Sequence, residues 1–208
     1  MKNIIFDFDG TLGDTVAPSL NSMKTALVES KANYDASKLN ADLMVMSTDE
    51  IIATLKVSGD VRAIFKRFIQ IRMQNTEGTY LYPGIKKLLN DLKNGKQLFI
   101  ATNNFTPIID MTLKMLDIDI FNDIRTSDYK GAQMSKNQMV ADLVTQYKLP
   151  LSETVMIGDG MADIVAGKNA GIKTIAVDWG YDSDKKALKQ YADFYVKTAT
   201  ELKSILAR

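Results

Sequence analysis

Hydrophobic positions along the chain fall into two alternating patterns, one typical of strands and the other of helices. Five short apolar runs predict strands, and a weaker sixth run lies near Asp123–Thr126. Between these runs, apolar residues recur every three or four positions, as they do on one face of a helix. The alternation predicts an α/β fold: a Rossmann-like parallel sheet with helices on both faces. The five strands are expected at Asn3–Phe8, Gln97–Thr102, Thr154–Gly158, Lys173–Val177 and Asp193–Val196.

The segment between residues 16 and 80 interrupts this alternation, because its pattern is helical throughout. Ser47 and Glu50 are spaced as a capping box, in which each side chain binds the other residue's backbone N–H at the start of a helix. A second amphipathic pattern follows at residues 61–69. The chain is therefore expected to form a core domain at residues 1–15 and 81–208 and an inserted α-helical cap domain at residues 16–80, with linkers near Gly13 and Gly78.

The composition excludes several kinds of chemistry. The 208 residues include no cysteine and no histidine, which rules out disulfides, thiolate metal sites, Ser-His-Asp catalysis and histidine-ligated zinc. The net charge of +1 does not indicate a nucleic-acid partner, and no apolar stretch is long enough to indicate a membrane span. Any catalysis must rest on Asp, Glu, Lys, Ser, Thr or Tyr. We expect a cytoplasmic protein, either a monomer or a homodimer.

The first predicted strand ends in the acidic sequence Asp7-Phe8-Asp9-Gly10-Thr11. Period-two alternation places Asp7 and Asp9 on the same side while the strand lasts, and Gly10 allows the backbone to turn sharply. Two close carboxylates repel each other, so a nearby cation would stabilise them. The alternative is an acidic strand end without a function, and these residues alone do not decide between the two.

Two further segments carry groups that suit a bound phosphate. Thr102 and Asn103 lie at the end of the second strand, where a hydroxyl and an amide can donate hydrogen bonds to phosphate oxygens. Lys136 begins a predicted helix, from which it could reach an anion as a point charge, and Lys130 competes for this role. The structural alternatives are a helix cap for Thr102 and Asn103, and a solvated surface lysine for Lys136.

The third strand ends in Gly158-Asp159, and Asp163 follows four residues later. If a helix begins there, the two carboxylates lie on one face. Carboxylate oxygens are typical ligands of Mg²⁺, although either aspartate alone could instead cap a helix. Because the carboxyl ends of parallel strands form one edge of a sheet, all these groups are expected to meet there. Together they predict a phosphoryl-transfer site that uses magnesium.

These residues resemble the motifs of the haloacid dehalogenase-like hydrolases. The stretch from Asp7 to Thr11 is similar to their first motif, Thr102 to the second, Lys136 to the third, and Gly158 to Asp163 to the fourth. The helical insertion and the sequence from Asp163 to Gly171 resemble the phosphoglycolate phosphatase-like branch. The chain departs from the family pattern at Asn137, which replaces the frequent proline after the motif lysine, and at Gly13, Asn104 and Met161.

The resemblance implies a magnesium-dependent phosphatase that hydrolyses a small phosphorylated metabolite through an aspartyl-phosphate. Asp7 would be the nucleophile, and Asp9 would protonate the leaving oxygen and later deprotonate water. Asp7, the backbone carbonyl of Asp9, Asp159 and Asp163 would hold Mg²⁺. Thr102, Asn103 and Lys136 would bind the phosphate.

Two alternative functions remain open at the level of sequence. One is a sugar-phosphate mutase resembling β-phosphoglucomutase, although such proteins often carry a histidine at the start of the cap, where this chain has Pro18 and Ser19. The other is a catalytically idle module that keeps a phosphate-binding site. The substrate is not predicted. The cap offers Lys56, Arg62, Arg67 and Arg72 as cations that could select it, and a solvated helix face is the ordinary alternative for each.

Overall fold

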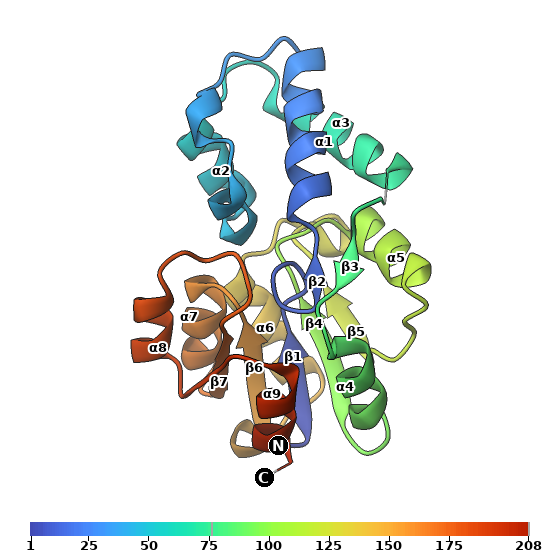
Figure 1. The fold of residues 1–208 in the computed structure, drawn as a ribbon, viewed down its shortest axis with the longest axis vertical. Helices are drawn as coiled ribbons and strands as arrows, with labels where there is room; N and C mark the ends of the chain where they lie inside the picture. The colour runs from blue at the N-terminus through green and yellow to red at the C-terminus, as the bar shows by residue number, and fades with distance from the viewer. Residues whose placement is uncertain (76, 208) are drawn as a thin grey trace.

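The computed structural model describes residues 1–75 and 77–207, and its centre is a six-stranded parallel sheet (Figure 1). The strand order is β5-β4-β1-β6-β7-β8, so β1 lies in the interior, between β4 and β6. This arrangement confirms the predicted α/β sheet, including its weaker strand. The strands are β1 (Asn3–Phe6), β4 (Gln97–Ala101), β5 (Asp123–Arg125), β6 (Thr154–Gly158), β7 (Lys173–Val177) and β8 (Phe194–Val196).

Helices cover both faces of the sheet because alternate residues of each strand point to opposite sides. Ile4 and Phe6 of β1 join one buried cluster with α4 (Ile85–Leu92), α5 (Thr106–Met115) and α9 (Ala199–Leu206). Ile5 points the other way and packs with α6 (Lys136–Gln146) and α7 (Met161–Asn169). Beside α7, α8 (Lys185–Tyr191) contributes Leu188 to a smaller cluster.

Several strands are shorter than predicted, and the first of them matters for the site. β1 stops at Phe6 rather than Phe8, because the carbonyl of Phe8 accepts hydrogen bonds from Leu12 and Gly13 (both 2.9 Å) and so closes a tight turn. The expectation that strand alternation holds Asp7 and Asp9 on one side is therefore wrong. β4 ends at Ala101, and β8 begins at Phe194.

The helical insertion stands over the carboxyl ends of the strands (Figure 1). It comprises α1 (Val16–Glu29), the short helices η1 (Ala36–Lys38) and η2 (Ala41–Val45), α2 (Thr48–Leu55) and α3 (Val61–Gln74). The predicted capping box is present: Ser47 N donates to Glu50 (2.7 Å) and Glu50 N to Ser47 (3.4 Å). The insertion has its own buried cluster, which continues into the core through Ile108 of α5.

The two linkers of the insertion lie side by side. β2 (Gly13–Asp14) pairs antiparallel with β3 (Tyr80–Leu81), so the chain leaves the core and returns to it at one place. The exact division of the chain into two domains stays a prediction. Within the described ranges, 1–75 and 77–207, no helix combines the length and the apolar character that crossing a bilayer requires.

Candidate active site

The turn after β1 is built for a close approach to Asp159. Gly10 has φ of +77°, a conformation that residues with a side chain rarely adopt. A Cβ atom on Gly10 would lie 2.2 Å from Asp159 Oδ2, so the turn also has no room for a side chain. The next residue binds the same carboxylate, because Thr11 Oγ1 donates to Asp159 Oδ1 at 3.0 Å. The turn thus joins the end of β1 to the end of β6.

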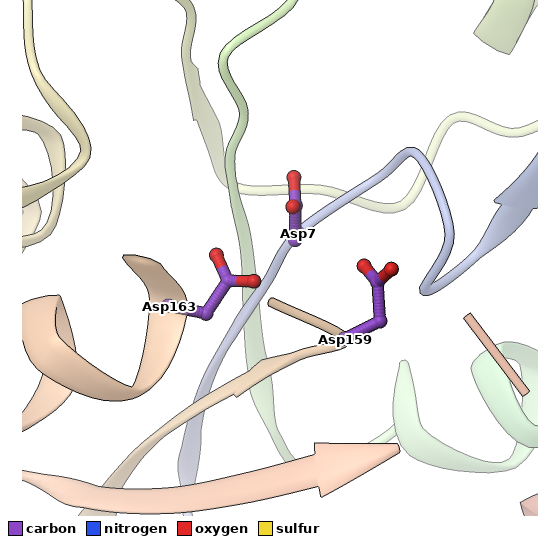
Figure 2. A group of neighbouring side chains, drawn as sticks. All are labelled: Asp7, Asp159 and Asp163. Atoms are coloured by element: carbon purple, nitrogen blue, oxygen red, sulfur yellow. The ribbon is translucent and has the colours of Figure 1, made fainter. Parts of the chain in front are cut away.

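Three carboxylates meet at this edge of the sheet: Asp7 after β1, Asp159 after β6 and Asp163 in the first turn of α7 (Figure 2). One oxygen of each lies within 4.8 Å of the corresponding oxygen of the other two. Asp159 and Asp163 are each 1% exposed, whereas Asp7 lines the cavity described below. Asp163 is further held by Gly160 N, which donates to its Oδ2 at 3.1 Å. Clustered carboxylate oxygens of this kind suit a divalent cation.

Lys136 provides the positive charge inside this group. Its Nζ lies 2.9 Å from Asp7 Oδ2 and 2.8 Å from Asp163 Oδ1, and it donates to the carbonyl of Ala101 at 3.0 Å. The residue is only 6% exposed. Lys130, the competing candidate, is exposed, and its Nζ lies 5.0 Å from the centre of the Tyr129 ring. The structure therefore brings Lys136, rather than Lys130, to the carboxylates.

Burial is the largest cause of the shifted carboxyl pKa values at this site. It raises the pKa of Asp7 well above its usual value; Asp163 and Asp159 act in the same direction, and Lys136 opposes them. Burial, followed by the charge of Asp163, raises the pKa of Asp159 to about 7. Burial would lower the pKa of Lys136, but Asp163 and Asp7 outweigh it and hold that pKa above its usual value. Three carboxylates against one ammonium leave an excess of negative charge that a bound cation would neutralise.

Asp9 lies apart from this carboxylate group and has its own hydrogen-bond partners. Its Oδ1 accepts from Thr15 Oγ1, and its Oδ2 accepts from Asn104 Nδ2 at 3.0 Å and from Thr102 Oγ1 at 3.4 Å. These contacts hold the carboxylate at the end of β4. The predicted use of its backbone carbonyl as a metal ligand stays a prediction.

Sequence reasoning missed several residues that support these groups. Asn104 follows the predicted Thr102 and Asn103, so its position after the strand was an available signal. Thr15 is the last residue of the first predicted core segment and belongs to no motif. Tyr181 carries no motif, yet its backbone N–H donates to Asp159 Oδ2 at 2.7 Å and its hydroxyl accepts from Thr15 N at 2.6 Å.

A cavity between the insertion and the strand ends contains the predicted catalytic side chains. Asp7, Asp9, Lys136 and Asp163 line it, and so do Thr102 and Asn103. Asp159 lies just behind them, bound to Thr11 and Tyr181. The volume available to water is about 70 Å³. The predicted residues therefore lie together around one small enclosed space.

This arrangement is that of an α/β protein with an acidic site at the carboxyl ends of its parallel strands. The chain belongs to the haloacid dehalogenase-like hydrolases, since the model of that family matches residues 4–177. The family predicted from the sequence is therefore confirmed.

Curated relatives include proteins with different names. Tyrosine-protein kinase PtkA of Mycobacterium tuberculosis is 29% identical over 204 residues, and the match covers 95% of this chain but 66% of the kinase. The chain thus spans about two thirds of that relative's length. Phosphoglycolate phosphatase of Vibrio parahaemolyticus is 24% identical, and the match covers 100% of this chain and 96% of that enzyme.

Solved structures share the fold over almost the whole chain. A haloacid dehalogenase-like hydrolase from Streptococcus pneumoniae superposes with a TM-score of 0.82 at 23% identity, covering 99% of this chain and 98% of that one. CbbY from Rhodobacter sphaeroides, solved in complex with phosphate, has a TM-score of 0.78 at 21% identity and covers 97% of this chain and 96% of its own.

Proposed function

We propose that the protein is a magnesium-dependent phosphatase, similar in architecture to phosphoglycolate phosphatase, that hydrolyses small phosphate monoesters through an aspartyl-phosphate. The observation that carries the proposal is the pairing of Asp7 with Lys136 beside two buried carboxylates. A second acid, Asp9, lines the same cavity. The names of several relatives at about 25% identity agree with a phosphatase.

Asp7 is the proposed nucleophile. Its carboxylate attacks the phosphorus atom, and the bond between phosphorus and the leaving oxygen breaks. Burial raises its pKa, so the ionised form needs neighbouring positive charge, and Lys136 Nζ at 2.9 Å supplies part of it. A carboxylate needs no activating histidine, which is consistent with a chain that has none.

Asp9 is the proposed proton carrier. It donates a proton to the leaving oxygen and then takes one from the water that attacks the aspartyl-phosphate, which releases phosphate and restores Asp7. Its hydrogen bonds with Thr15 and Asn104 orient it for both steps. Thr102, Asn103 and Lys136 are proposed to bind the phosphate oxygens, since all three line the cavity.

Asp7, Asp159 and Asp163, together with the backbone carbonyl of Asp9, would hold the Mg²⁺ ion. The donor set fits this cation, because it consists of oxygen atoms and carries excess negative charge. When bound, Mg²⁺ would reduce the repulsion between an anionic carboxylate and an anionic phosphate.

The test is phosphate release from acetyl phosphate and p-nitrophenyl phosphate in the presence of Mg²⁺. Asp7→Asn keeps the shape of the side chain and removes the nucleophile, so activity should fall by at least about a thousandfold. Asp110→Asn is the matched control, because Asp110 is exposed on α5 and does not line the cavity. Near-wild-type activity in Asp7→Asn would disprove the mechanism.

A further inference from the structure

The wall that the insertion presents to the cavity is mainly apolar, and Ser19 and Thr48 are its polar members. Leu43, Met44 and Val45 from η2 and Phe65 and Phe68 from α3 line the side opposite the catalytic carboxylates. Phe105, which follows β4, continues this wall and packs against both phenylalanines, with ring centres 6.2 and 6.4 Å apart. A phosphate ester bound at Asp7 would have these hydrocarbon side chains on the insertion side of the same cavity.

Within the described part of the chain, Lys136 is the only cationic side chain that lines this cavity. It is already engaged by Asp7, Asp163 and the carbonyl of Ala101. A negative group at the far end of a substrate would thus meet no unengaged cation in the cavity lining. Burying an unpaired carboxylate costs far more than burying a hydrocarbon chain of the same size.

The cations of the insertion lie elsewhere. Arg67 forms an ion pair with Glu29 at 2.5 Å, and Lys56 is exposed and does not line the cavity. Arg72 is 1% exposed, donates to the carbonyl of Asn75 at 2.7 Å and does not line the cavity. It lies behind the lining, close enough for its charge to interact with Asp9, and its Nε has no hydrogen-bond partner within the described residues. Arg62 borders a neighbouring groove formed with residues 127–134.

We propose that the site selects phosphate monoesters whose alcohol portion is small, uncharged and apolar, and discriminates against those with a carboxylate or second phosphate. The proposal rests on the proposed phosphatase function and specifies its substrate class. The volume open to water in the cavity is about 70 Å³, which suits a short group beside the phosphate rather than an extended one. Phosphoglycolate, which carries a carboxylate, falls outside this class.

The first test measures binding, which does not depend on turnover. Propylphosphonate and 3-phosphonopropionate have chains of equal length, and only the second ends in a carboxylate. Isothermal titration calorimetry with Mg²⁺ present should give a dissociation constant at least about tenfold lower for propylphosphonate. Equal affinities, tighter binding of 3-phosphonopropionate, or binding of neither compound would each overturn the proposal.

The second test adds a cation to the apolar wall. Met44→Lys should improve the relative affinity for 3-phosphonopropionate by about tenfold or more, because the carboxylate gains a partner. Met73→Lys is the matched control: Met73 lies exposed on α3, away from the cavity, so the same substitution should leave the preference unchanged. An equal change in relative affinity in both variants would show that the preference depends on the net charge of the protein rather than on the residues of the cavity wall.

The two proposals can fail separately. Acetyl phosphate has a small uncharged acyl group, and its hydrolysis tests the catalytic chemistry. If acetyl phosphate is hydrolysed but the two phosphonates bind equally, the chemistry stands and the selectivity is wrong. If the binding preference is found without hydrolysis, the selectivity of the cavity stands and the catalytic mechanism is wrong.

Discussion

Lys136 has a structural role as well as a proposed chemical one. It is the counter-charge that allows Asp7 and Asp163 to be buried together, since its Nζ lies within 2.9 Å of both. A buried charge that loses its partner is strongly destabilising. The stability of the fold and the proposed catalysis would therefore depend on the same ammonium group.

Lys136→Met should lower the free energy of unfolding at pH 7.5 by roughly 3–5 kcal/mol, because it leaves buried carboxylates without a cation. The loss should be smaller at pH 5, because the raised pKa of Asp7 lets that carboxyl group keep a proton and need no counter-charge. Urea denaturation in EDTA at both pH values measures this. Lys130→Met, at an exposed position, is the control. An equal loss at the two pH values would contradict the electrostatic explanation.

Asp159 gives the metal-free protein a defined pH dependence. Its pKa is about 7 when folded and near 3.8 when unfolded, so between these values the folded state keeps a proton that the unfolded state has released. Stability from this group is therefore highest below about pH 4, falls as the pH rises, and levels off above pH 7.

The free energy of unfolding of the wild type, measured relative to Asp159→Asn in EDTA, should fall by up to about 4 kcal/mol between pH 4 and pH 7. Subtracting the variant removes the contributions of carboxylates such as Asp91 and Asp123, whose pKa values are lowered and whose effect has the opposite sign. A difference that stays constant with pH would show that Asp159 does not titrate in this range.

At the residue scale, the residues that belong to sequence motifs could be predicted. The residues that form hydrogen bonds with those side chains and so position them could not. Asp7, Asp159 and Lys136 could be named because each follows or begins a recognisable element. Tyr181 could not, because its contribution to Asp159 is a backbone N–H, which any residue could supply. Whether a lysine is buried also depends on tertiary packing, so Lys130 and Lys136 remained competitors until the structure separated them.

At the element scale, the features that depend on residues close together in the sequence were the most predictable. The Ser47 capping box and the strands were visible in the sequence because their determinants lie within a few residues. The end of β1 was placed two residues too late because the turn that ends it is closed by the N–H groups of Leu12 and Gly13. A second capping box, at Ser135 and Gln138, begins the helix that carries Lys136.

The two capping boxes permit a matched comparison. Ser47→Ala and Ser135→Ala should each lower the free energy of unfolding by about 1 kcal/mol, because each leaves a helix N-terminus less well capped. Only Ser135→Ala should also lower kcat, by roughly tenfold, since Lys136 lies in the first turn of that helix. Urea denaturation and phosphate-release kinetics measure the two effects. A similar loss of kcat in both variants would indicate a general rather than a local cause.

At the scale of the whole molecule, the sequence predicted a helical insertion but not the surface that it presents. The cavity wall combines η2, α3 and the segment after β4, which are distant in sequence, and no local pattern brings them together. The insertion and the core also meet through Gln133, whose side-chain amide donates to Asp49 at 3.4 Å. Such contacts depend on the final packing of the two parts.

Mg²⁺ should stabilise the whole molecule if the acidic group binds it. At a Mg²⁺ concentration a hundred times the dissociation constant, the gain should be about 2.7 kcal/mol, visible as a higher unfolding midpoint. The gain should be larger at pH 8 than at pH 5.5, because protons compete for Asp7 and Asp159, whose pKa values are raised. Asp159→Asn should weaken the response, and an unchanged response in that variant would place the ion elsewhere.

The pairing of β2 with β3 has a consequence for how such a protein can diversify. Gly13 lies opposite Leu81, and Asp14 lies opposite Tyr80. The chain therefore leaves the core for the insertion and returns from it at the same place. Replacing the insertion with another helical segment requires no new strand in the central sheet and no change in its order. If the proposed function holds, a change of insertion could therefore alter which substrates are recognised while the proposed catalytic residues of the core stay in place.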